Sequence, residues 1–196
     1  MIGREDNALI IFARKPELGK VKTRLAASIG NNKALNIYKL LLNHTRSVAK
    51  AANATTFIFV TESVTDDFWG SFPCELQSGE NLGEKMHHAF ELIFAKGYKK
   101  CVIIGSDCPE LSTEIINYAF EVLKDHAAVI GGANDGGYYL LGTKKLVPSL
   151  FQNKAWSTAN VFENTIQDFI NENLSYKQLP FLNDLDEEKD IPEGWL

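Results

Sequence analysis

The sequence has little cysteine and no long apolar run. Its three cysteines, Cys74, Cys101 and Cys108, are an odd number without metal-ligand spacing, which argues against a disulfide framework. We therefore expect three reduced thiols in a cytoplasmic protein. No apolar stretch approaches the ~20 residues that cross a bilayer, so we expect no membrane span. The short apolar run over 8–12 is also too short for the hydrophobic region of a secretory signal.

An excess of positive charge is absent as well. The formal net charge is −5, which argues against a broad surface for nucleic acid. The segment 14–24 is an exception, because it carries five basic residues against one acid, Glu17. These basic residues are Arg14, Lys15, Lys20, Lys22 and Arg24. One basic loop in an acidic protein indicates a small anionic ligand rather than a polymer.

The apolar pattern predicts an α/β fold in a single domain over 1–196. Short apolar runs predict strands over 8–12, 56–60, 74–77, 101–104, 127–130, 138–141 and 176–179. Helical spacing predicts helices over 33–50, 82–95, 113–123 and 159–170, with a short helix or turn over 66–71. This alternation predicts a mostly parallel sheet with helices on both faces.

Three local features of that fold are predicted separately. Residues 131–137, GGANDGG, read as a long glycine-rich turn, and the strands beside it are too close for a parallel crossover. We therefore expect one antiparallel strand there. Gly142 is expected to end the strand over 138–141, and Thr23 is a candidate N-cap for the helix that follows the basic segment.

Asp107 is presented at the end of a buried strand. Cys101–Ile104 is a continuous apolar run, Gly105 and Ser106 end it, and Pro109 prevents the strand from continuing. Open α/β sheets bind ligands at this end of their strands. A carboxylate there needs a partner, and Mg²⁺ or Mn²⁺ with phosphate oxygens would supply one. We predict that Asp107 is catalytic and holds the metal; the alternative is that it caps the helix beginning near Ser112.

The basic segment directly follows the first predicted strand. It lacks both the GxxxxGK[ST] pattern of a P-loop and the GxGxxG pattern of dinucleotide folds. We assign its cations, together with Ser106, to the phosphates of a nucleotide. The alternative is a solvated basic face, which is common for such runs.

Asp135 lies in the turn NDGGYY. A carboxylate here could act as a second catalytic group, the general base for an acceptor hydroxyl. The neighbours that we assign to substrate binding are Asn134, Gly136, Gly137 and Tyr138. The alternative is a plain hairpin turn, because Asn-Asp-Gly is a turn signal by itself.

Three further groups are weaker candidates. Gln77 and Gly79 follow another predicted strand, where an amide and backbone groups could read a nucleobase. His87 and His88 are consecutive on a helix, so we expect that they do not face one ligand together and assign them no metal. Asp184 and Asp186 could point the same way on an extended segment, but a solvated acidic tail is the preferred interpretation.

Four segments occur together in a familiar order: IIFARKPELGKVKTRLA, QSGENLGEKM, VIIGSDCPEL and ANDGGYYLLG. With WST at 156–158 and the tail DLDEEKD, they cover nearly the whole chain. The chain resembles a bacterial family of GT-A-like transferases, long a domain of unknown function. Its members are called radical-SAM/selenodomain-associated transferases or arsenosugar-biosynthesis glycosyltransferases. The resemblance implies a nucleotide-diphospho-sugar transferase fold, also shared with molybdenum-cofactor and phospholactate guanylyltransferases.

The resemblance also implies roles for single residues. Asp107 matches the aspartate that holds the metal between the phosphates, and Asp135 matches the aspartate of the DGGY motif. Lys20, Lys22 and Arg24 match the basic loop. The chain departs from its relatives at Lys85, where many carry Arg, and in the tail, where two glutamates replace Thr-Pro.

These patterns leave three functions open. The first is a metal-dependent glycosyltransferase with a nucleotide-sugar donor and a small-molecule acceptor. The second is a nucleotidyltransferase that couples a nucleoside triphosphate to a phosphorylated small molecule. The third is a binding protein that holds a nucleotide without turnover. The sequence leaves the donor base, the sugar, the acceptor and the oligomeric state open.

Overall fold

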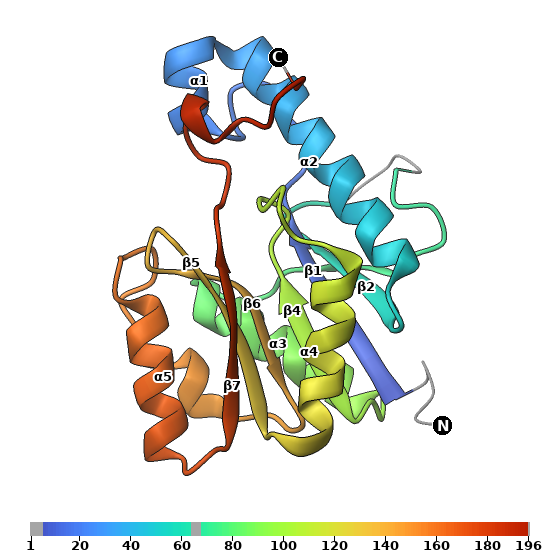
Figure 1. Cartoon of the computed structure of the whole chain (residues 1–196). Helices are drawn as coiled ribbons and strands as arrows, with labels where there is room; N and C mark the ends of the chain where they lie inside the picture. The colour runs from blue at the N-terminus through green and yellow to red at the C-terminus, as the bar shows by residue number, and fades with distance from the viewer. Residues whose placement is uncertain (1–5, 64–67, 196) are drawn as a thin grey trace.

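A seven-stranded sheet in the order β3-β2-β1-β4-β6-β5-β7 forms the centre of the molecule (Figure 1). The computed structural model describes residues 6–63 and 68–195. Within these ranges the strands are β1 (Asn7–Ala13), β2 (Thr55–Val60), β3 (Cys74–Leu76), β4 (Lys100–Ile104), β5 (Ala128–Ala133), β6 (Tyr138–Thr143) and β7 (Tyr176–Leu182). All of them run in one direction except β6, which is antiparallel to β4 and β5. The predicted α/β fold is therefore confirmed.

Helices cover both faces of this sheet. The described α-helices are α1 (Thr23–Ile29), α2 (Asn31–Ala51), α3 (Leu82–Ala95), α4 (Thr113–Asp125) and α5 (Val161–Asn171), with 3₁₀ turns η2 (Pro148–Phe151) and η3 (Glu188–Asp190). One apolar cluster joins α1, α2 and α4 to the sheet, and the other joins α3, η2 and α5. Among the described residues, every helix is too short or too polar to span a bilayer.

The central strands β1 and β4 are apolar after their first residues, Asn7 and Lys100, because both of their faces are buried. In β1, Leu9 and Ile11 belong to the first cluster, whereas Ala8 and Ile10 belong to the second. This alternation follows from the period of two in a strand. Because β1 and β4 are parallel partners, their carboxyl ends lie side by side.

The predicted antiparallel hairpin is confirmed, but its turn is shorter than expected. Gly131–Ala133 belong to β5, and the turn begins only at Asn134. The prediction that Gly142 ends its strand is wrong, because β6 continues to Thr143. Gly142 pairs with Val102 on one side and Val129 on the other, so a side chain there would crowd both neighbours.

The structure decides the predicted caps at the starts of α1 and α4 and describes part of the segment over 66–71. Thr23 is not an N-cap, because α1 begins at Thr23 itself and Lys22 precedes it in the left-handed conformation, with φ of 47°. Ser112 caps α4 by accepting from the amide of Ile115, which leaves no capping role for Asp107. The element predicted over 66–71 lies partly outside the described residues, and its remaining part is a turn.

The C-terminal tail crosses the carboxyl ends of the strands. After β7 the chain runs towards α1, and η3 packs beside that helix (Figure 1). Leu185 is fully buried, and its amide donates to the carbonyl oxygen of Asp107 at 2.9 Å. The tail is thereby fixed directly over the end of β4.

Candidate active site

A cleft of about 860 Å³ opens at the carboxyl ends of β1 and β4. Its lining comes mainly from the basic segment after β1, the 105–108 turn after β4, the β5–β6 hairpin, the start of α3 and residues 156–159, with Tyr38 and Gln77 between them. The C-terminal tail adds Asp184 and Asp186. Because parallel strands end at one edge of a sheet, loops far apart in the sequence meet here.

Lys22 and two carboxylates form the centre of the cleft. Lys22 Nζ lies 3.3 Å from Asp107 Oδ1 and 3.3 Å from Asp186 Oδ1. The Lys22 side chain is only 6% exposed, whereas that of Asp107 is 48% exposed. Arg24 Nη1 lies 3.3 Å from the other carboxylate oxygen of Asp186. The basic segment and the strand-end carboxylate therefore meet at one place, joined by the tail.

Asp184 adds a further carboxylate to the same place. Burial, together with the negative charges of Asp107 and Asp135, raises its pKa to about 7. A cluster of carboxylates with too little positive charge around it disfavours ionisation of its most buried member. The interpretation of Asp184 and Asp186 as a solvated tail is therefore wrong, because both lie in the cleft.

Arg14 and Ser106 are held by a buried tyrosine. Tyr38 accepts the backbone N–H of Arg14 at 2.9 Å, and its hydroxyl donates to the Arg14 carbonyl at 3.1 Å. Its oxygen also lies 3.5 Å from Ser106 Oγ. Burial and the charge of Asp107 raise the pKa of Tyr38 to about 12, so it stays a neutral donor. Tyr38 thus connects the turn after β1 to the turn after β4.

The other two cations of the basic segment, Lys15 and Lys20, form ion pairs with Glu17. Lys15 Nζ lies 3.2 Å from Glu17, and Lys20 Nζ lies 2.6 Å from the other oxygen of the same carboxylate. Neither lysine lines the cleft, whereas Arg14, Lys22 and Arg24 do. The structure therefore brings three of the five predicted cations to the site.

Of the predicted hairpin residues, too, only some line the cleft. Asp135, Gly137 and Tyr138 line the cleft, and the Gly137 amide donates to Asp135 Oδ1 at 2.8 Å. Gly136 has φ of +89° and packs against the backbone of Ala159, where a Cβ would overlap the carbonyl oxygen. The interpretation of this segment as a hairpin turn is therefore correct, and the turn is packed tightly against Ala159.

Asn134 is held away from the cleft by the tail. Its amide donates to Asn183 Oδ1 at 2.6 Å, and the Asn183 backbone amide donates to Glu110 Oε2 at 2.9 Å. These contacts connect the hairpin, the tail and the turn after β4. Asn134 thus positions the site and does not line it.

The loop before α3 supplies one predicted residue. Gln77 lines the cleft, and its side-chain amide donates to the Phe59 carbonyl oxygen at 3.0 Å. Gly79 does not line the cleft; it packs against Glu84 in the first turn of α3. Asn81 caps that helix by accepting from the Glu84 amide at 3.0 Å.

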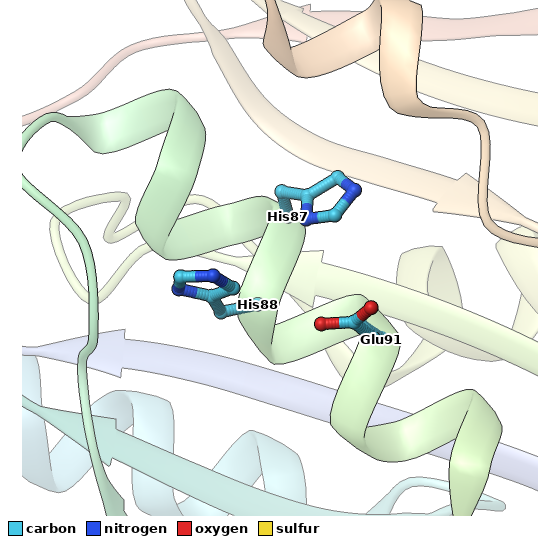
Figure 2. A group of neighbouring side chains, drawn as sticks. All are labelled: His87, His88 and Glu91. Carbon is cyan, nitrogen blue, oxygen red and sulfur yellow. The ribbon is translucent and has the colours of Figure 1, made fainter.

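A second polar cluster lies on the exposed part of α3 (Figure 2). His87, His88 and Glu91 each offer a ligand atom, and these atoms lie within 4.8 Å of one another. The prediction that the two histidines cannot face one ligand is therefore wrong, because flexible side chains bridge the angle between consecutive helix positions. None of the three lines the cleft.

Some cleft residues were not predicted from the sequence. Tyr38 lies in the helix predicted over 33–50 without a role of its own, and Trp156 belongs to the WST motif that supports the family resemblance. The one signal for the tail was the D-L-D spacing of Asp184 and Asp186, which permits a common direction but does not require it.

Comparison with known proteins identifies the family and the fold of this chain. A model of the DUF2064 family, described as an uncharacterized protein conserved in bacteria, matches residues 44–158. A proposed nucleotide-diphospho-sugar transferase from Desulfovibrio desulfuricans G20 has a similar structure, with 32% identity and a TM-score of 0.89. That similarity covers 93% of this chain and 83% of the other. None of the curated proteins matches the chain.

Two more distant structures share the fold alone. The 4-diphosphocytidyl-2C-methyl-D-erythritol synthase from Anaerococcus prevotii DSM 20548 is 12% identical over 95% of both chains, with a TM-score of 0.63. Rv0371c from Mycobacterium tuberculosis H37Rv, solved in complex with manganese, is 11% identical over 94% of both chains, with a TM-score of 0.55. The fold is that of the nucleotide-diphospho-sugar transferases.

Proposed function

The chain belongs to the bacterial DUF2064 family, and we propose that it is a metal-dependent glycosyltransferase. It would take a sugar from a nucleotide-diphospho-sugar and pass it to a small-molecule acceptor. The observation that carries this proposal is the position of Lys22 Nζ, 3.3 Å from both Asp107 and Asp186. This contact shows one positive charge, the Lys22 ammonium, between two carboxylates, with Arg14 and Arg24 also lining the cleft.

The donor set fits a hard divalent cation. Asp107 and Asp186 offer carboxylate oxygens on either side of one positive charge, and Mg²⁺ or Mn²⁺ prefers such oxygens together with phosphate. We therefore assign these two aspartates as its ligands, with Asp184 beside them. When bound, the metal would neutralise charge on the pyrophosphate of the donor. The manganese complex of Rv0371c supports a divalent cation in this fold.

Basic side chains would stabilise the departing nucleotide. Lys22, Arg24 and Arg14 line the cleft around the carboxylates. Once a divalent cation and a pyrophosphate are present, the Lys22 ammonium has phosphate oxygens as alternative partners to the carboxylates. Such preorganised positive groups stabilise negative charge as it develops on a leaving group.

Asp135 is our candidate for the group that accepts a proton. One of its oxygens is held by the Gly137 amide at 2.8 Å, and the exposed side chain lines the cleft. The acceptor hydroxyl would transfer its proton to Asp135 while its oxygen bonds to the anomeric carbon of the sugar. The bond between that carbon and the β-phosphate oxygen would break, releasing a nucleoside diphosphate.

The second candidate is a nucleotidyltransferase. It is favoured by the fold shared with cytidylyltransferases such as the Anaerococcus prevotii synthase. Its chemistry needs the same cations and carboxylates around a triphosphate. The two functions therefore differ in the nucleotide that the cleft prefers.

Binding measurements distinguish these candidates. We expect nucleotide sugars to raise the melting temperature of the protein in the presence of Mn²⁺, and Asp107→Ala to remove that effect. Because Asp107 is ion-paired but caps no helix, the variant should melt close to the wild type without ligand. Asp125→Ala, an exposed change at the end of α4, is the matched control.

Other outcomes would assign another function. Stabilisation by nucleoside triphosphates alone would contradict the glycosyltransferase and favour the nucleotidyltransferase. Binding of nucleotide sugars without turnover, tested against a panel of hydroxyl acceptors, would favour a nucleotide-binding protein.

A further inference from the structure

Residues 156–159 form a wall of the cleft that carries no charge. Trp156, Ser157, Thr158 and Ala159 all line the cleft, in the connection between η2 and α5. Trp156 is half-buried: part of it packs against the second apolar cluster, and the rest borders the open cleft. The wall thus contains an indole and two hydroxyl groups, of which that of Thr158 donates to the Ala155 carbonyl oxygen at 2.7 Å and can still accept.

Two glycines pack closely against the two ends of this wall. Gly83, in the first turn of α3, touches the indole of Trp156, and a Cβ there would lie 2.6 Å from Trp156 Nε1. Gly136, next to Asp135, touches the backbone of Ala159. The Phe162 amide also donates to the Gly136 carbonyl at 2.9 Å. The wall therefore extends from the loop before α3 to the candidate general base.

The backbone of the wall is also unusual. Among the described residues, the non-glycine residues with positive φ are Lys22, Asn153, Ser157 and Asn173. Asparagine tolerates this conformation, but lysine and serine rarely adopt it. Both of these, Lys22 and Ser157, line the cleft. Unfavourable backbone conformations of this kind concentrate at ligand sites, where the surrounding structure maintains them.

The position of the wall indicates what it binds. The nucleotide would lie between the basic segment and the Gln77 loop, and the acceptor hydroxyl would lie at Asp135. The transferred sugar must lie between these two, which is where the wall runs. An indole beside hydroxyl groups suits a ring that has apolar faces and a polar rim.

We propose that Trp156 is the platform on which the sugar ring of the donor stacks. This inference rests on the proposed glycosyltransferase function and names the part of the donor that the wall recognises. Nucleoside diphosphate, which lacks the sugar, would not need Trp156. The residue would therefore set the preference of the cleft for nucleotide sugar over nucleotide.

Calorimetric titration with UDP-glucose, UDP, GDP-mannose and GDP, each with Mn²⁺, tests this assignment. We expect Trp156→Ala to weaken binding of the sugar nucleotide that the wild type prefers by about five- to tenfold, with the matching diphosphate nearly unchanged. Trp156→Phe should recover part of the loss. Trp195→Ala, which removes a tryptophan from the first apolar cluster instead, should leave both affinities unchanged.

Intrinsic fluorescence gives a readout independent of turnover. The change in tryptophan emission on adding the sugar nucleotide should disappear in Trp156→Phe and persist in Trp195→Phe. Equal losses for diphosphate and sugar nucleotide would overturn the proposal, because Trp156 would then hold the nucleotide. An unchanged preference in a folded Trp156→Ala would overturn it too, because the residue would only pack.

The same measurements distinguish failure of the glycosyltransferase proposal from failure of the Trp156 assignment. If the wild-type protein binds none of the sugar nucleotides, the glycosyltransferase function and the platform are both refuted. If it binds them and Trp156→Ala retains the wild-type preference, only the platform is refuted. If Trp156→Ala changes only the KM of the acceptor, the wall holds the acceptor and the assignment to the donor sugar is wrong.

Discussion

Replacing Asp184 by Asn should stabilise the protein without metal at neutral and alkaline pH. Burial, together with the charges of Asp107 and Asp135, raises the pKa of Asp184 from its ordinary 3.8 to about 7 in the folded state. A shift of roughly 3 units corresponds to about 4 kcal/mol at high pH. Part of the side chain remains exposed to water, so we expect a gain of about 1–3 kcal/mol.

The sign follows from proton linkage. Below pH 3.8 the carboxyl group is protonated in both folded and unfolded states, so ionisation costs nothing. As the pH rises, the unfolded chain loses this proton first, and the folded state becomes relatively less stable until the pH passes about 7. Asparagine carries no titrating proton, so the advantage of Asp184→Asn should be absent near pH 3.8, grow up to pH 7 and then stay constant.

Urea unfolding in EDTA, followed by circular dichroism at several pH values, measures this advantage. Glu172→Gln, an exposed carboxylate at the end of α5, is the control and should show no comparable trend. A gain that does not depend on pH, or a variant less stable than the wild type at pH 8, would refute the reasoning. The same variant should also bind Mn²⁺ with a weaker dependence on pH, because metal binding displaces protons from carboxyl groups.

Three more predictions follow from single features of the cleft. Lys22→Met should raise the KM for the nucleotide substrate at least tenfold, because it removes a charge-assisted phosphate contact; steady-state kinetics with an unchanged KM would contradict this role. Gly136→Ala should cost about 2 kcal/mol or more in urea unfolding, because the added Cβ overlaps Ala159 and φ is +89°; wild-type stability would mean that the wall moves freely. Burial raises the pKa of the Cys108 thiol to about 12, so iodoacetamide at pH 8 should modify exposed Cys74 first; early labelling of Cys108 by mass spectrometry would show that the cleft opens.

The part of the fold that depends on local pattern was predictable. Both central strands, β1 and β4, are apolar on both faces and bounded by turn residues, so their positions follow from the sequence. The position of Asp107 after β4 then follows from Gly105 and Pro109. Its place in a cleft beside Lys22 follows from the parallel order of the strands.

Contacts between distant segments were not predictable. Lys22 and Asp186 are 164 positions apart, and no local pattern shows that an acidic tail returns to the first loop. The basic run likewise does not tell which cations pair with Glu17, since this depends on the path of the loop. In both cases tertiary packing decides between a solvated charge and a functional one.

The error at His87 and His88 has a different cause. Ideal helix geometry separates consecutive positions, but long side chains can swing back towards each other, and a carboxylate one turn later can meet both. A backbone rule therefore gives the direction of the Cβ atoms and not the final position of the ring nitrogens.

The path of the C-terminal tail makes the order of synthesis matter. Because Asp186 follows β7 and Lys22 follows β1, a nascent chain that stops after β7 would lack one of the two carboxylates that contact Lys22. The sheet could already have assembled at that stage, yet the proposed metal site would lack Asp186. If the proposed site is correct, proteolytic removal of the segment after β7 would therefore remove one of its ligands while leaving all seven strands in place.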